Sequence, residues 1–91
     1  MPMTKTTTIV WGSESDQYKT ELDTARNAKL AEMAADGKTD LTVEVINPTT
    51  TKRFWRDQAA AEEFISFITG QAEIFDCSVV STLIEDYTAP V

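Results

Sequence analysis

The chain has 91 residues, of which 42% are hydrophobic and 25% charged, with one cysteine, no histidine and a formal net charge of −7. This composition predicts one globular domain over residues 1–91, and it excludes a largely disordered chain and a disulfide framework. No apolar run is long enough for a signal peptide or a membrane span, so we expect a cytoplasmic protein without membrane partners.

The charges are unevenly distributed along the chain. Residues 1–37 carry four bases and six acids, residues 38–56 carry four bases and two acids, and residues 57–91 carry seven acids and no base. Nucleic-acid binders obtain most of their affinity from basic contacts to phosphates. We therefore expect no nucleic acid among the partners.

The first third of the chain predicts a strand followed by a helix. Residues 6–11, TTTIVW, are β-branched and aromatic, as is typical of a strand. Ser13 or Ser15 is suited to cap a helix that extends to about residue 35, and Gly37 is suited to the position after its last turn. The apolar stripe of this helix contains Tyr18, Leu22, Ala25, Leu30 and Met33, with Arg26 and Lys29 at its margin.

The middle of the chain predicts a β-hairpin. Residues 40–46 alternate between apolar and polar side chains, the NPTT sequence at 47–50 favours a turn, and residues 51–56 form a second strand. We expect the buried face of the first of these strands to contain Leu41, Val43 and Val45.

The last third predicts a second helix and a final strand. Asp57 is suited to cap a helix that extends to about residue 69, where Gly70 is expected to end it. Residues 74–84 are expected to form a strand, and residues 86–91 a frayed tail. The buried face of the helix is expected to contain Ala60, Ala61, Phe64, Phe67 and Ile68, whereas Glu62 and Glu63 face solvent.

The element order β-α-β-β-α-β predicts an α+β, ferredoxin-like fold with two helices on one face of a four-stranded antiparallel sheet. The other face would then carry an apolar set of outward side chains. A patch of this kind is normally covered, and a second copy of the chain is the simplest cover. We therefore expect a homodimer whose interface contains Val10, Ile46, Val80 and Ile84.

The segment TKRFWRDQ, residues 51–58, places three cations around two adjacent aromatic residues. Phe54 and Trp55 must point to opposite faces of a strand, and the sequence does not decide which one faces the core. One hypothesis is that Arg53, Trp55 and Trp11 bind a small anionic or aromatic ligand. The alternative is that the cations pair with the acidic helices.

The residues that catalysis would need are sparse. Without histidine, the chain lacks the commonest general base and metal ligand. Cys77 stands alone within the expected final strand, which favours inert packing over reactivity. The RNA-recognition motif has the same topology, but it interleaves glycines with its aromatic residues, and TKRFWRD contains none. We therefore expect no catalytic residues, no metal and no cofactor.

The segment RFWRDQAAAEEFISFI, residues 53–68, resembles the strand–helix unit of small uncharacterised ferredoxin-like proteins found in tailed phages. This resemblance implies a viral accessory protein in the host cytoplasm. The topology is also similar to dimeric α+β barrel proteins of the antibiotic-biosynthesis monooxygenase type, which use a cleft between sheet and helices, often without a cofactor. Some of them use a histidine, which this chain lacks.

Two functions are therefore expected. The first is a non-enzymatic, dimeric interaction or accessory protein with an unidentified protein partner. The alternative is a small-molecule binder or cofactor-free enzyme of the α+β barrel type.

Overall fold

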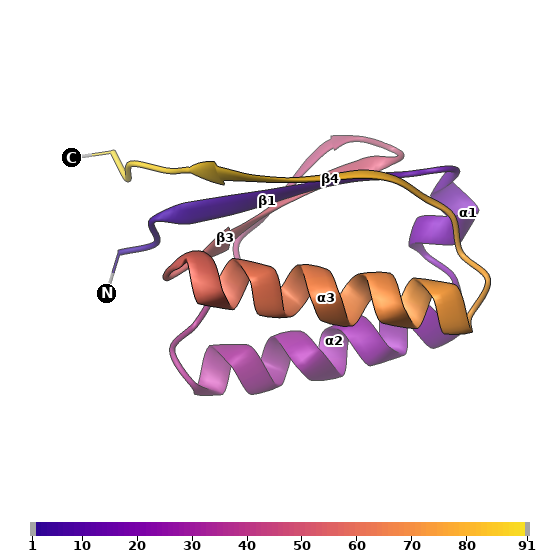
Figure 1. Cartoon of the computed structure of the whole chain (residues 1–91), viewed down its shortest axis with the longest axis horizontal. Coiled ribbons are helices and arrows are strands. Elements are labelled where there is room, and N and C mark those ends of the chain that lie inside the picture. The colour runs from indigo at the N-terminus through magenta and orange to yellow at the C-terminus, as the bar shows by residue number, and fades with distance from the viewer. Residues whose placement is uncertain (1, 91) are drawn as a thin grey trace.

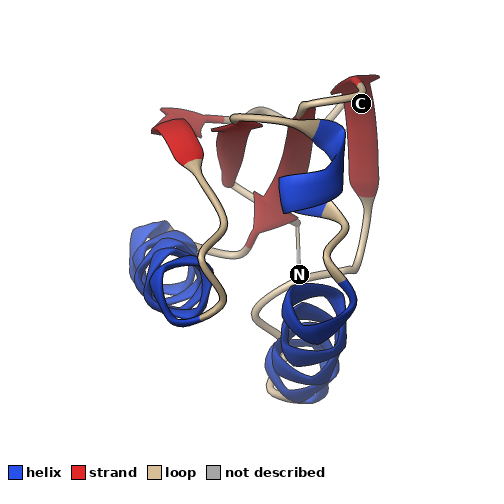
Figure 2. Ribbon diagram, turned by 90° about the vertical axis from the view of Figure 1, so that its right-hand side faces the viewer, coloured by secondary structure: helices blue, strands red, loops and turns tan. Residues whose placement is uncertain are grey.

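The computed structural model describes residues 2–90, which form an α+β structure with a four-stranded antiparallel sheet and three helices. The strands lie in the order β2-β3-β1-β4. Figure 1 shows the strands as one layer and the two long helices side by side as another, and the end view in Figure 2 agrees. The elements are β1 (Lys5–Trp11), α1 (Glu14–Gln17), α2 (Thr20–Ala35), β2 (Val43–Asn47), β3 (Thr50–Trp55), α3 (Gln58–Ile74) and β4 (Val79–Asp86).

The first predicted helix is divided into α1 and α2. Ser13 caps α1 as expected, because its Oγ accepts a 3.1 Å hydrogen bond from the backbone N–H of Asp16. The helix stops after Gln17, whose buried side chain donates a 2.8 Å hydrogen bond to the carbonyl oxygen of Pro48. Gly37 follows α2 with a φ of 73°, the left-handed conformation expected of it.

The second predicted helix, α3, is longer than expected. Asp57 caps it, accepting a 2.9 Å hydrogen bond from the N–H of Ala60. Gly70 does not end the helix, which continues to Ile74. An interior glycine costs only about 1 kcal/mol relative to alanine, and the additional turn buries Ala72. Because α3 is longer, β4 starts at Val79 and Cys77 lies in the connection before it.

The expected hairpin is present, but its first strand is exposed. β2 and β3 are antiparallel and are joined by Pro48 and Thr49. The prediction that Leu41, Val43 and Val45 are buried is wrong, since they are 50%, 45% and 57% exposed. β2 is an edge strand, α3 packs against β1, β3 and β4, and α2 packs chiefly against α3. No helix therefore covers β2 closely.

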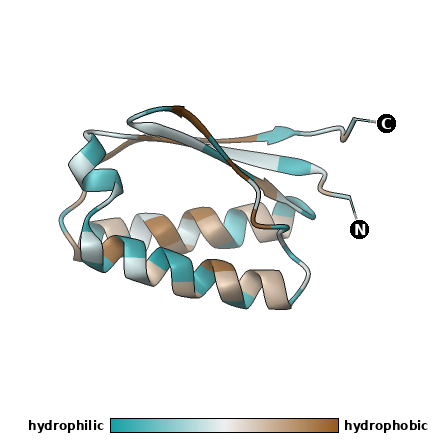
Figure 3. Cartoon of the chain, turned by 180° about the vertical axis from the view of Figure 1, so that it is seen from behind, coloured by the Kyte–Doolittle hydropathy of each residue, from teal (hydrophilic) through white to brown (hydrophobic). Residues whose placement is uncertain are grey.

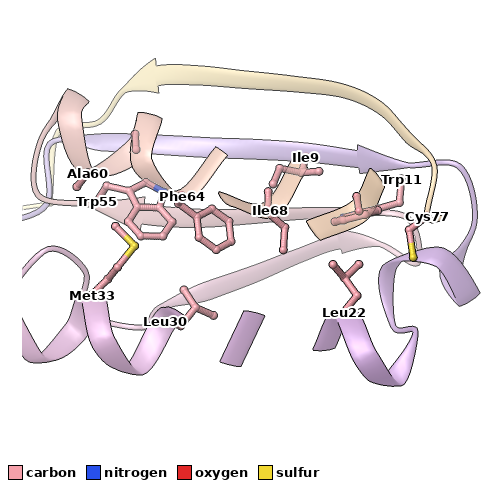
Figure 4. Packing of buried hydrophobic residues seen from close by; sticks show 12 residues of the cluster. Ile9, Trp11, Leu22, Leu30, Met33, Trp55, Ala60, Phe64, Ile68 and Cys77 are labelled. Atoms are coloured by element: carbon pink, nitrogen blue, oxygen red, sulfur yellow. The ribbon is translucent and has the colours of Figure 1, made fainter. Parts of the chain in front are cut away.

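The core lies between the central strands and the two long helices (Figure 4). Trp55 is fully buried, and its ring centroid lies 4.7 Å from that of Phe64 on α3. Its indole Nε1 donates a 2.9 Å hydrogen bond to the Oγ1 of Thr7 on β1. Trp55 is thus the aromatic residue that faces the core. The buried cluster contains Ile9, Trp11, Leu22, Leu30, Met33, Trp55, Ala60, Ala61, Phe64, Ile68, Ala72 and Cys77.

The opposite face of the sheet is more polar than expected. Phe54 points to this side and packs edge-on against Tyr87, with ring centroids 4.8 Å apart. In the cross-strand register, Phe54 lies opposite Thr6, and Lys52 lies opposite Thr8. On the β4 side of β1 this face continues with Ser81, Leu83 and Glu85. The outward set therefore consists largely of threonine, serine and charged residues.

Candidate interaction surface on β2

Exposed apolar side chains are concentrated on the two edge strands. Within residues 2–90, eight large hydrophobic residues are markedly exposed, and neither central strand, β1 or β3, contributes one. Figure 3 shows hydrophobic colouring on β2 and at the end of the connection that leads into it. The five on edge strands are Val43, Val45 and Ile46 on β2, and Val80 and Leu83 on β4.

The outer edge of β2 has no neighbouring strand among the described residues. Free edges recruit further strands, and proteins usually protect them with lysine, proline or inward-pointing charges. β2 has the sequence VEVIN, so Glu44 is its one charge. A bulge between Val45 and Asn47 interrupts the ladder at one end. The rest of the edge is apolar and open.

Arg53 lies beside β2 on the helix side of the sheet. It shares a face with Trp55 and is the direct cross-strand partner of Val43. Partial burial, followed by the charge of nearby Arg26, lowers the pKa of Arg53 to about 10. A guanidinium in this position is therefore poorly solvated and close to a like charge.

Arg26 supplies that like charge from α2. Its side chain is only 6% exposed, and its Nη2 donates a 2.7 Å hydrogen bond to the Oδ1 of Asp23. The Arg26 guanidinium carbon also lies 5.8 Å from the ring centroid of Tyr18. Arg26 is thus held in place by its own neighbours.

Arg53 differs from most cations of the chain because it has no acidic partner within residues 2–90. Six of the eight lysines and arginines form ion pairs among residues 2–90, and the two without one are Lys52 and Arg53. Every buried side-chain nitrogen and oxygen in the described region has a hydrogen-bond partner. The side chain of Arg53 makes no hydrogen bond within that region, so its nitrogens are not fully buried and reach water. The half-buried guanidinium is available to an anion.

The ligand site predicted from the sequence is brought together only in part. Trp11 and Trp55 are 2% and 0% exposed, so their rings serve the core. Arg53 shares the face of Trp55 but pairs with Thr7, four residues before Trp11 on β1. Arg26 and Val43 are the neighbours of Arg53 that sequence reasoning missed. The position of Arg26 at the margin of the apolar stripe of the helix was the sequence feature that could have indicated its proximity to the sheet.

The four residues predicted for a dimer interface lie in different environments. Ile46 and Val80 are 51% and 66% exposed, on opposite edge strands. Val10 is half-buried on the polar face. Ile84 lies opposite Thr7 and packs against the core, on the helix side of the sheet. The expected phase of β4 is therefore wrong for Ile84, because a bulge between Val10 and Trp11 shifts the register.

Other groups offer little chemistry. Burial raises the pKa of the Cys77 thiol, which disfavours the reactive thiolate. Among residues 2–90 no three metal-binding side chains gather at one place, and no pocket is found. None of the helices in this range is long and apolar enough to cross a membrane.

In comparisons with known proteins, no protein-family model and no curated protein matches the chain.

Proposed function

We propose that the protein is a non-enzymatic interaction protein that works as a homodimer and contacts an unidentified protein partner. The observation that carries this proposal is the exposure of apolar residues on the edge strands, above all on β2. Val43, Val45 and Ile46 would each lose part of their unfavourable contact with water when the edge of β2 is paired.

The dimer contact is proposed at the β2 edge. Two copies of β2 would pair antiparallel about a twofold axis, which gives both copies the same surface and joins their sheets. The opposite face of the sheet is a weaker candidate, because Thr6, Thr8 and Lys52 occupy its centre. Ile46 belongs to both versions of the interface, whereas Val80 belongs only to the open-face version.

The ferredoxin-like arrangement is also proposed, with α2 and α3 on one face of the sheet. It is supported by the strand order β2-β3-β1-β4 and by the contacts of α3 with β1, β3 and β4. The similarity of residues 53–68 to small phage proteins supports a viral accessory role in the host cytoplasm.

Three lysine substitutions at exposed valine and leucine residues would test the β2 contact. Val45→Lys should convert the dimer to a monomer, because a charge on the free edge opposes strand pairing. Leu83→Lys and Val80→Lys, on β4, should leave the dimer intact. Light scattering after size-exclusion chromatography measures each mass. If the β4 variants dissociate and Val45→Lys does not, the contact lies elsewhere.

A further inference from the structure

We propose that Arg53 is a binding site for a carboxylate whose apolar portion rests on Val43 and Val45. This site goes beyond the proposed dimer. It uses the guanidinium on the helix side of the sheet, whereas strand pairing uses the backbone edge of β2. Either proposal can therefore fail while the other stands.

Arg53 is in an unusual state for a cation of an acidic protein. The chain has 15 acids for eight bases, yet Arg53 has no acidic partner among the described residues. Asp23 is the carboxylate whose charge acts on the pKa of Arg53, but its Oδ1 is already paired with the Nη2 of Arg26 at 2.7 Å. A half-buried charge without a partner is unfavourable, and an anion would relieve this cost.

Arg26 places a like charge near Arg53, with Asp23 as its counter-charge. Arg26 is almost completely buried and contributes its charge at Arg53. Arg26 already donates a hydrogen bond to Asp23, so it would influence the ligand only through its charge. The ligand itself would be bound by Arg53. Partial burial lowers the local dielectric, which strengthens a charge-assisted hydrogen bond at this position.

The chemistry around Arg53 indicates the class of the ligand. A guanidinium presents paired N–H donors that match the two oxygens of a carboxylate. One available guanidinium suits a single negative charge better than a phosphate, which needs more donors. Val43 lies opposite Arg53 and Val45 lies opposite Thr51, so both valines share its face and are about half exposed. These neighbours favour an acid with an apolar body.

The experiment is an NMR titration that follows the Nε–H signal of Arg53 and the methyl signals of Val43 and Val45. Hexanoate is the first probe and hexanamide its uncharged control. The tripeptide acetyl-Val-Glu-Val-amide, with its glutamine counterpart as control, is the second. We expect saturable shifts of the Arg53 and valine signals together, with the uncharged control about tenfold weaker or more.

The two probes distinguish the sources of the carboxylate. Saturation by hexanoate at least as tight as by the tripeptide indicates a free organic acid. Clearly tighter binding of the tripeptide indicates an acidic residue of a protein partner. If acid and amide bind equally, the contact is only apolar and the proposal is overturned. The absence of saturation with either acid in the millimolar range also overturns it.

A matched pair of variants isolates the guanidinium. Arg53→Gln should abolish the charge-dependent part of binding, and Arg53→Lys should weaken it. Lys52→Gln removes the adjacent unpaired charge on the opposite face and should bind as the wild type does. Equal loss in Lys52→Gln and Arg53→Gln would show a general effect of net charge and contradict the proposal. If Arg53→Gln does not fold, the Arg53→Lys comparison and the wild-type titrations still decide the outcome.

Discussion

Val43 is the direct cross-strand partner of Arg53, and the two residues lie on the helix side of the sheet. An apolar side chain that is 45% exposed thus stands next to a half-buried cation that has no acidic partner in the described part of the chain. The exposure of Val43 arises because β2 lies at the sheet edge, where α3 does not reach. The position of β2 at the edge of the sheet therefore accounts for the exposed apolar surface that is proposed to form the interface.

The charge of Arg53 should reduce the stability of the isolated chain. Its pKa is lowered by burial and then by Arg26, so the folded state disfavours the charged form. This cost is complete at pH values below the folded pKa of about 10, and it is relieved only as the pH rises above that value. Arg53→Met should therefore raise the free energy of unfolding at pH 7, by up to about 1 kcal/mol. Urea unfolding measures the difference.

Arg56→Met is the control for that experiment. Arg56 is paired with Asp57, with its Nε 3.0 Å from the Asp57 Oδ2, so its removal should give no gain in stability. A loss of stability in Arg53→Met as large as that of a core truncation would show that the guanidinium is satisfied in the folded state.

Glu63 should connect α2 to α3 in a pH-dependent way. Its carboxylate lies 2.9 Å from both Lys29 and Lys38, contrary to the expectation that it merely faces solvent. Hydrogen bonds from these lysines, Lys29 first, lower the pKa of Glu63. The stabilisation is thus present above the unfolded pKa, near 4.5, and is lost as the pH falls through the lower folded value.

Glu63→Gln should accordingly cost about 0.5–1 kcal/mol at pH 7 and much less at pH 3. Glu62→Gln is the neighbouring control, since Glu62 is exposed and forms no ion pair among residues 2–90. Urea unfolding at the two pH values measures both variants. Equal effects of the two substitutions at pH 7 would contradict a specific role for the bridge.

The buried hydrogen bond between Trp55 and Thr7 should contribute to stability beyond simple packing. Trp55→Phe and Thr7→Val each remove one partner of the 2.9 Å contact. A double-mutant cycle on the free energy of unfolding should give a coupling of about 0.5–1.5 kcal/mol. A coupling indistinguishable from zero would mean that the contact adds nothing to the packing of the indole ring.

Phe64 should be one of the most sensitive core positions. It is 1% exposed and stacks at a tilt against Trp55. Phe64→Ala should lower the free energy of unfolding by about 3–5 kcal/mol, because it leaves a cavity between α3 and the sheet. Ser66→Ala, at an exposed position of the same helix, should stay within about 0.5 kcal/mol. Similar losses in both variants would contradict the orientation of α3.

Features that depend on a few neighbouring residues could be predicted from the sequence. The caps at Ser13 and Asp57, the left-handed Gly37 and the hairpin turn at Pro48 follow from local backbone chemistry. The alternation around Phe54 also predicted correctly that one of the two adjacent aromatic residues faces the core.

Features that depend on tertiary coverage could not be predicted in this way. The alternation of Val43 and Val45 shows which side chains share a face, but it does not show whether a helix covers that face. The face of the sheet to which Ile84 points depends on a β-bulge that no residue pattern indicated. Arg53 lacks an acidic partner among residues 2–90 because Asp23 is paired with Arg26. This depends on how α2 lies relative to β3, two elements that are far apart in the sequence.

Whether the chain dimerises, as proposed for its exposed apolar edge, is measured by sedimentation velocity of the wild-type protein over a wide concentration series. We expect a species with twice the mass of the single chain, whose fraction rises with concentration through the micromolar range. A single species with the mass of one chain, up to high micromolar concentration, would contradict it.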